Sequence, residues 1–363
     1  TKIELPGRGD DSRRNFPIVN GESAYFMNLN RNKRGMTLNL KSEKGKEIFR
    51  ELVKQSDIVL ENYRPGVMEK LGLGYEDLKK INPAIIYGAV SGFGHYGPYS
   101  KRAGYDIIGQ AMSGLMSTTG WPGGPATRCG TPMGDVLGGL NLTVGVLAAL
   151  VNKQRTGLGE KVDVALVDSV ASAMENITMI YQSTGRIPQR IGNRYESTYP
   201  YDVFPASDGD VVIAAGNAKL WKILCSVMGS PELADAPKFA GIQERIANHE
   251  ELREIISSWT RNHTIDEIDK MLNDAGCPAC PVNTIDRLVK DPQIAGDRGM
   301  FPEIDQPGMG KLQITAMAQK LTRTKSCPRK GAPLLGEDNA AIYGEMLDFD
   351  EAKLTELKEK GVI

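Results

Sequence analysis

The chain has 363 residues, of which 40% are hydrophobic and 25% are charged, as is usual for a globular protein with one large or two moderate cores. We expect two domains. Lysine and arginine together number 44 against 45 acidic residues, so the formal net charge is -1. This balance argues against nucleic acid and against an anionic membrane surface as partners.

The cysteines and the most apolar stretch both favour a cytoplasmic location. Five scattered cysteines are too few for a disulfide framework in a chain of this length, and free thiols suit a reducing compartment. Residues 136–151 fall short of the roughly 20 apolar residues that span a bilayer and include glycine and asparagine, so we predict a buried helix there. The chain opens with Thr1 and has no signal-like apolar run, and we expect a further segment upstream of it.

Between residues 42 and 181, β-rich runs alternate with helical patterns, which is typical of βαβ units around a mainly parallel sheet. Ser42 can cap a helix whose apolar residues, including Ile48 and Leu52, fall on one face. The predicted strands then span 57–60, 84–90 and 162–166, and the predicted helices span 134–151 and 168–181. This part of the chain is therefore predicted to be α/β.

A stretch rich in proline, glycine and tyrosine at 188–205 predicts an interdomain connection. After it, residues 211–215 predict a buried strand, and Thr264 and Glu267 have the spacing of a capping box at the start of a helix that ends at Gly276. Two closing helices are predicted at 338–346 and 350–360. The predicted domains are a large domain at 1–187, a small α+β domain at 206–306 and a return to the large domain at 307–363.

Three patterns look like functional motifs but are better explained as ordinary structure. Residues 92–97 match G-x-G-x-x-G, yet Pro98 follows where an apolar helix should begin, so we interpret this segment as a glycine-rich loop. Cys277 and Cys280 have redox spacing but follow the end of a helix instead of opening one. The histidines are isolated in the sequence, at positions 95, 249 and 263, and we predict no metal site.

Residues 129–140 place one acidic residue, Asp135, at the start of an apolar, glycine-rich helix. Asp135 could simply be a helix cap. A carboxylate at a helix N-terminus is also held ionised by the helix dipole, and as a nucleophile it needs no general base, unlike serine. Gly134, Gly138 and Gly139 remove side chains where a thioester would approach, and backbone N–H groups could stabilise an oxyanion. Covalent carboxylate catalysis is therefore a second interpretation.

Motifs spread along the whole chain decide between these interpretations. They include Lys2-Ile3-Glu4, Gly9-Asp10, Asn30-Arg31-Asn32-Lys33-Arg34-Gly35, Leu38-Asn39-Leu40-Lys41, Glu61-Asn62-Tyr63-Arg64-Pro65-Gly66, Gly104-Tyr105-Asp106, Gly134-Asp135 and Ala332-Pro333-Leu334-Leu335-Gly336-Glu337. In this order they resemble the class III CoA-transferase family, also called the CaiB/BaiF family. The resemblance covers essentially the whole length of the chain.

The resemblance implies an enzyme that moves coenzyme A (CoA) from an acyl thioester to a free carboxylic acid, with Asp135 as its nucleophile. Asp135 would attack the acyl-CoA to give a mixed anhydride, and the released CoA thiolate would convert this to an aspartyl-CoA thioester. The acceptor acid would then attack, and the cycle would run in reverse. Because water would hydrolyse these intermediates, a closed, glycine-lined site suits the chemistry. CoA enters as part of the acyl-CoA substrate, and no permanently bound cofactor is expected.

The resemblance also implies a set of CoA contacts, in which cations would meet phosphates and apolar or aromatic groups would border the adenine or the pantetheine arm. The candidate contacts are Leu38, Lys41, Asn62, Tyr63, Lys70, Arg102 and Tyr105, and Gly138 and Gly139 are the candidates for close approach of the thioester. Each lysine could equally be a solvated surface charge. Some family members carry arginine at the position of Leu5 and lysine at that of Ala103, next to Arg102, and these departures weaken the set of contacts.

Two alternative functions remain open at this point. An α-methylacyl-CoA racemase, from the same family, would use a His/Asp pair as acid and base, but the histidine falls at Tyr105, whose reference pKa of about 10 makes it a poor base at neutral pH. A non-catalytic acyl-CoA-binding protein would keep the phosphate contacts and would not need Asp135. The aspartate in its glycine-rich setting favours the transferase.

For the fold, the resemblance implies a large Rossmann-like domain, a smaller α+β domain reached by long linkers, and two chains threaded through one another as an interlocked homodimer. The family also has an opening βα unit ahead of the Lys2-Ile3-Glu4 match, and part of its CoA site lies there. We therefore expect the site of this chain to be incomplete without that unit.

Overall fold

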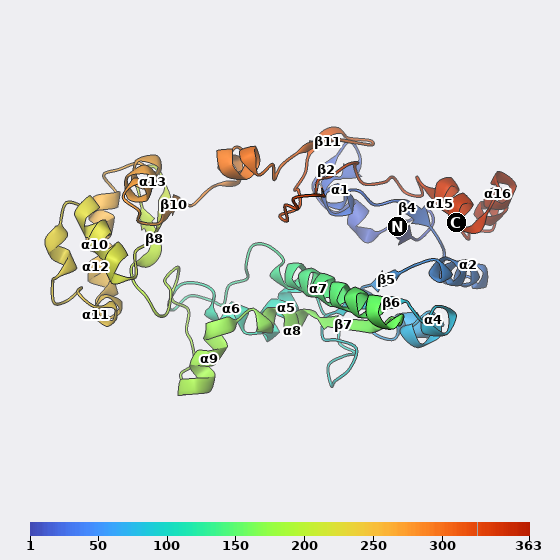
Figure 1. Cartoon of the computed structure of the whole chain (residues 1–363), viewed down its shortest axis with the longest axis horizontal. Helices are drawn as coiled ribbons and strands as arrows, with labels where there is room; N and C mark the ends of the chain where they lie inside the picture. Colours follow the sequence, from blue (N-terminus) through green and yellow to red (C-terminus); the bar gives the residue numbers. More distant parts are fainter. Residues whose placement is uncertain (325) are drawn as a thin grey trace. The chain divides into compact units, whose positions relative to one another are not determined.

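The computed structural model of the protein describes residues 1–324 and 326–363 and has a mixed α/β architecture with several small sheets (Figure 1). Contacts between residues group the chain into two compact units. Unit 1 comprises Thr1–Tyr105, Gly134–Ser169 and Asp286–Ile363, and unit 2 comprises Asp106–Met133 and Val170–Ile285. The predicted α/β class is confirmed in this general form, whereas the Rossmann-like assignment, the domain boundaries and the dimer stay predictions.

Three parallel strands form the main sheet of unit 1, in the order β5 (Ile58–Glu61), β6 (Ile86–Ser91) and β7 (Lys161–Ala165). The register pairs Glu61 with Ala89, and Ser91 with Ala165. These strands confirm the three predictions for this region to within two residues at each end. Because the strands are parallel, their carboxyl ends lie at one edge of the sheet, which we call the carboxyl edge.

The core of unit 1 lies under α2 (Glu43–Lys54) and the two closing helices, α15 (Asn339–Leu347) and α16 (Glu351–Glu359). Ser42 caps α2 as predicted, because its hydroxyl accepts the backbone N–H of Gly45 at 3.0 Å. Ile48 and Leu52 are buried on the face of α2 that packs in this core, as the apolar pattern predicts. Each such side chain contributes about 1.5–3 kcal/mol on burial.

The long helix α7 (Met133–Thr156) runs alongside the main sheet (Figure 1). Glycines let it come close: a Cβ on Gly138 would lie 2.7 Å from Leu166 Cδ2, and a Cβ on Gly145 would lie 2.6 Å from Val162 Cγ1. Leu166 follows the carboxyl end of β7, whereas Val162 lies near its start. The helix therefore runs antiparallel to the strands, and its N-terminus lies at the carboxyl edge.

The opposite face of α7 is apolar and exposed. Val136, Leu140, Val144, Leu147 and Val151 recur at helical spacing with exposed fractions between 44% and 66%, and we call this set the α7 stripe. Within the described residues, α7 is also the one helix long and apolar enough to cross a membrane by length and composition, and 22% of its most apolar window is buried. The prediction of a buried helix is therefore wrong for the single chain, because the sheet covers only one side of α7.

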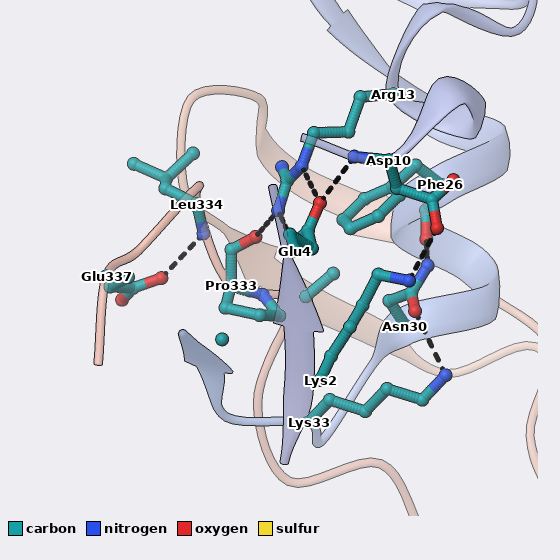
Figure 2. Close-up of polar contacts among 12 residues, drawn as sticks. Lys2, Glu4, Asp10, Arg13, Phe26, Asn30, Lys33, Pro333, Leu334 and Glu337 are labelled. Atoms are coloured by element: carbon teal, nitrogen blue, oxygen red, sulfur yellow. Dashed lines mark hydrogen bonds and ion pairs between the residues drawn. The ribbon is translucent and has the colours of Figure 1, made fainter. Parts of the chain in front are cut away.

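A polar network fixes the first strand, β1 (Lys2–Glu4), which pairs in parallel with β4 (Gly35–Thr37). Figure 2 shows the carboxylate of Glu4 accepting two hydrogen bonds from the Arg13 guanidinium, both of 2.8 Å, and one of 2.8 Å from the N–H of Asp10. The Arg13 guanidinium also lies 3.9 Å from the ring centre of Phe26 in α1 (Ala24–Asn30). The buried carboxylate is thus fully compensated by donors.

Unit 2 is built around an antiparallel sheet of β8 (Tyr201–Pro205), β9 (Asp210–Ala214) and β10 (Ala279–Pro281), with β9 in the centre. Its core is completed by α10 (Ala218–Val227), α12 (His249–Thr260) and α13 (Ile265–Asp274). The predicted capping box is present, since Thr264 and Glu267 each accept the other's backbone N–H. Both the predicted strand and the predicted helix start are confirmed here.

The helix predicted at 168–181 is divided into α8 (Leu166–Ser172) and α9 (Glu175–Thr184). The break falls where Glu175 has a φ of 42°, a left-handed conformation that a continuous helix does not allow. The remaining elements are η1 (Asp11–Arg14), β2 (Ile18–Val19), β3 (Glu22–Ser23), α3 (Val67–Lys70), α4 (Tyr75–Ile81), α5 (Asp106–Met112), α6 (Leu115–Thr118), η2 (Pro231–Ala234), α11 (Ile242–Ala247), α14 (Ile285–Leu288), η3 (Pro292–Asp297), β11 (Glu303–Gln306) and β12 (Gly310–Gln313).

Candidate active site

The candidate nucleophile and two candidate CoA contacts lie at the carboxyl edge of the main sheet. Asp135 is exposed in the first turn of α7, whose N-terminus reaches this edge. Asn62 and Tyr63 follow directly after β5 and are also exposed. Ligands of open α/β sheets bind at this edge, because the loops after the strands meet there.

The two glycines that follow Asp135 in α7 have different surroundings. Gly138 is buried against Leu166, so close packing on the sheet is sufficient reason for a glycine there. Gly139 is exposed, and a Cβ built on it would meet no atom within 4 Å. A substrate can therefore approach the first turns of α7 closely at Gly139. The backbone N–H groups of this turn carry the positive end of the helix dipole, which favours an ionised carboxylate and a developing oxyanion.

The three candidate cations lie on separate segments of unit 1, and all are exposed. Lys41 precedes α2, and its N–H donates to the side chain of Asn39 at 3.1 Å. Lys70 is the last residue of α3. The Arg102 guanidinium stacks on the ring of Tyr99, 3.7 Å from its centre. Exposed ammonium and guanidinium groups of this kind are suited to phosphate groups that stay partly in water.

Leu38 and Tyr105 differ sharply in exposure. Leu38 is 2% exposed within the core, and its N–H donates to the carbonyl oxygen of Glu4 at 2.8 Å. Leu38 therefore offers a ligand almost no accessible surface. Tyr105 is 72% exposed and lies at the end of the loop that follows β6. Tyr63 is half exposed, and partial burial raises the pKa of its hydroxyl, as does the nearby Glu61.

Several of the sequence motifs stabilise the fold instead of forming the candidate active site. Arg13 links the two ends of the chain, because it binds Glu4 and also donates to the carbonyl oxygen of Pro333 at 3.0 Å (Figure 2). In the same segment the carboxylate of Glu337 accepts the N–H of Leu334 at 2.8 Å. The motifs at 2–10 and 332–337 are thus explained by hydrogen bonds that join them through Arg13 and stabilise each segment.

The functional look-alikes are also explained by packing. Gly92 lies against Gly104, since a Cβ on Gly92 would come 2.5 Å from the Gly104 Cα, and the loop after β6 turns back on itself there. No dinucleotide-type helix follows this glycine-rich segment before α5. Cys277 is buried after the end of α13, and Cys280 is exposed on β10, so neither opens a helix.

A buried polar cluster lies directly behind Asn62 and Tyr63. The side chains of Glu61 and His95 are 4% and 8% exposed, and 3.6 Å separates Glu61 Oε1 from His95 Nε2. Lys161 Nζ lies 2.9 Å from His95 Nδ1, and the Tyr87 hydroxyl donates to Glu61 Oε1 at 3.3 Å. The sequence gives no spacing signal for this cluster, because its members come from β5, β6, β7 and the loop after β6.

A sequence model of CoA-transferase family III matches residues 1–339. The chain belongs to this family. It is 40% identical over 350 residues to the acetyl-CoA:oxalate CoA-transferase of Acetobacter aceti, covering 95% of this chain and 87% of that one. It is 34% identical over 363 residues to the human succinyl-CoA:glutarate CoA-transferase, covering 100% and 83%. The crystal structure of a CaiB/BaiF family protein from Brucella suis is similar with a TM-score of 0.83 at 36% identity, covering 95% and 90%.

Membership of family III makes the chain a CoA-transferase, an enzyme with an acyl-CoA among its substrates. The resemblance found from the sequence motifs is confirmed. His95 is isolated in the sequence, but in this CoA-transferase the loop after β6 brings it against Glu61 and Lys161. The one available signal was the position of Glu61 at the end of a strand, immediately before two candidate CoA contacts.

Proposed function

We propose that this CoA-transferase works through covalent intermediates on Asp135. The Asp135 carboxylate attacks the thioester carbonyl of the donor acyl-CoA, the C–S bond breaks, and a mixed anhydride and CoA thiolate form. The thiolate attacks the aspartyl carbonyl, which releases the donor acid and leaves an aspartyl-CoA thioester. The acceptor carboxylate attacks this thioester and expels CoA thiolate, which then takes the acceptor acyl group and frees Asp135.

One observation carries this proposal: Asp135 stands exposed in the first turn of α7, at the carboxyl edge of the main sheet, with open backbone at Gly139 one turn away. The helix dipole favours the ionised form that attacks, and the same N–H groups can stabilise the tetrahedral oxyanion. Family membership supports the reaction class independently of this geometry.

For the substrates, we propose a dicarboxylic acid as acceptor and a short acyl-CoA as donor. The relatives described above are named for oxalate and glutarate, both dicarboxylates, with acetyl-CoA and succinyl-CoA as donors. An assay of oxalate, succinate and glutarate against acetate and butyrate, with each donor, tests this class. A faster rate with every monocarboxylate than with any dicarboxylate would contradict it.

We propose that CoA lies along the segments that follow β4, β5 and β6. Lys41, Lys70 and Arg102 are exposed cations that would meet its phosphates, and Asn62 and Tyr63 would border the pantetheine arm or the adenine. Leu38 would support these segments from within the core, because it is buried and its N–H is bonded to the carbonyl oxygen of Glu4. In the same proposal, a second copy of the chain covers the α7 stripe, since exposed aliphatic surface of this extent on a helix favours an interface.

Replacing Asp135 by Asn tests the nucleophile. We expect Asp135→Asn to fold and bind CoA but to lose at least about a thousandfold in the transfer rate, because the amide oxygen cannot form the anhydride. Asp168→Asn is the matched control, since Asp168 is an exposed aspartate in the first turn of α8. Exchange in Asp135→Asn within tenfold of the wild-type rate would refute the assignment.

A further inference from the structure

The buried carboxyl group of Glu61 fixes the conformation of the backbone that follows it. Its side chain is 4% exposed, although it is the last residue of β5 and its neighbours Asn62 and Tyr63 are exposed. Glu61 Oε2 accepts the backbone N–H of Tyr63 at 2.7 Å. A hydrogen bond that the N–H of residue i+2 donates to the side chain of residue i fixes the backbone between them. The bond therefore sets the direction in which Asn62 and Tyr63 leave the sheet.

The other oxygen of Glu61 is held from the neighbouring strand. The Tyr87 hydroxyl donates to Glu61 Oε1 at 3.3 Å, and Tyr87 is fully buried in β6. Because the Tyr63 N–H binds one oxygen and the Tyr87 hydroxyl binds the other, the carboxyl group cannot rotate away from the Tyr63 N–H. Because β5 and β6 are paired, Tyr87 holds the Glu61 carboxyl group in place, and this carboxyl group in turn holds the turn at Asn62 and Tyr63.

The His95 ring is the third group, after Tyr63 and Tyr87, that lies against the Glu61 carboxyl group. The Lys161 ammonium has only protons to offer, so its 2.9 Å contact makes His95 Nδ1 the acceptor and leaves the ring proton on Nε2. That nitrogen is buried without a hydrogen-bond partner and faces Glu61 Oε1 at 3.6 Å. The backbone N–H of His95 donates to both carboxylate oxygens of Asp163, at 3.2 and 3.0 Å, which anchors the ring's position.

Burying a carboxyl group costs desolvation free energy, which its hydrogen bonds to Tyr63 and Tyr87 offset only in part. An apolar side chain of the same length would fill this place without that cost, yet it would leave the Tyr63 N–H without its acceptor. We propose that Glu61 is a positioning residue for CoA: as hydrogen-bond acceptor for the Tyr63 N–H, it holds the Asn62–Tyr63 turn in the conformation that binds the cofactor portion of the substrate. This inference rests on the proposed CoA contacts at Asn62 and Tyr63.

An isosteric pair of variants at Glu61 separates this role from a general structural one. Glu61→Gln keeps an oxygen that can accept the Tyr63 N–H, whereas Glu61→Met fills the same space without an acceptor. The measurement is the Kd of free CoA by isothermal titration calorimetry, together with kcat at saturating acyl-CoA. We expect the Kd to rise about tenfold in Glu61→Met and to stay within about threefold of wild type in Glu61→Gln, with kcat nearly unchanged in both.

Two controls make the outcome decisive. Tyr63→Ala tests the CoA contacts themselves: if it binds CoA as tightly as wild type, the proposed contact set fails and the role of Glu61 fails with it. If Tyr63→Ala binds weakly but Glu61→Met binds like wild type, or if Glu61→Gln loses as much affinity as Glu61→Met, only the positioning role is overturned. Glu51→Gln, the same change at an exposed glutamate in α2, should bind CoA like wild type.

Discussion

Burial shifts the pKa values of Glu61 and His95 in opposite directions. It raises the pKa of the Glu61 carboxyl group above its usual 4.5 and lowers the pKa of His95 below its usual 6.5. The Lys161 ammonium lowers the pKa of His95 further, and Asp163 and Glu69 oppose this to a smaller extent. Because the unfolded chain binds the histidine proton more readily, the stability that neutral His95 contributes is complete above about pH 6.5 and is lost as the pH falls through its folded-state pKa.

Replacing His95 by Gln therefore changes how stability depends on pH. Glutamine does not titrate, so we expect the free energy of unfolding of His95→Gln to fall less than that of wild type between about pH 7 and pH 5.5. In both proteins, protonation of Glu61 instead raises the free energy of unfolding as the pH falls. Its raised pKa makes the folded state bind that proton at a higher pH than the unfolded state does. Urea titrations at a series of pH values measure the difference, and parallel curves for the two proteins would disprove the assignment to His95.

The packing of helix α7 depends on where its glycines face. A Cβ at Gly138 would lie 2.7 Å from Leu166 Cδ2, closer than two carbon atoms can approach without a shift, whereas a Cβ at Gly139 would stand in open space. Adjacent positions of one helix thus differ in what they tolerate, while both have the same low helix propensity.

Alanine substitutions at these two positions should therefore have opposite effects on stability. We expect Gly138→Ala to cost about 1–3 kcal/mol, because the buried Leu166 side chain must move, and Gly139→Ala to add about 0.5–1 kcal/mol through helix propensity. Chemical denaturation of the two variants measures both. Equal stability of the two proteins would show that α7 does not pack on the sheet through Gly138.

The α7 stripe predicts that the whole protein associates with a second copy of itself. Its five aliphatic residues are about half exposed, and we expect a homodimer in solution that Leu147→Glu converts to monomer or to insoluble protein. Light scattering coupled to size exclusion gives the mass directly. Ile242→Glu, at an exposed isoleucine of unit 2, serves as control and should keep the wild-type mass. A monomeric wild type, or an unchanged mass of Leu147→Glu, would contradict the dimer.

Local signals were sufficient for much of the element order. The cap at Ser42, the capping box of Thr264 and Glu267 and the three parallel strands all follow from short-range chemistry, and the structure agrees with each. The exposure of α7 could not be predicted, because an apolar pattern is the same whether a sheet or a second chain covers it. The meeting of Glu61 and His95 could not be predicted either, since strand pairing and a loop create it without any sequence spacing.

We propose that acyl transfer runs through a covalent bond to Asp135. The most direct test incubates the protein with acetyl-CoA or succinyl-CoA, traps the intermediate with hydroxylamine or borohydride, and maps the modified peptide by mass spectrometry. We predict a modification on the peptide that contains Asp135 in wild type and none in Asp135→Asn. A modification elsewhere, or active protein that never carries one, would contradict the covalent mechanism.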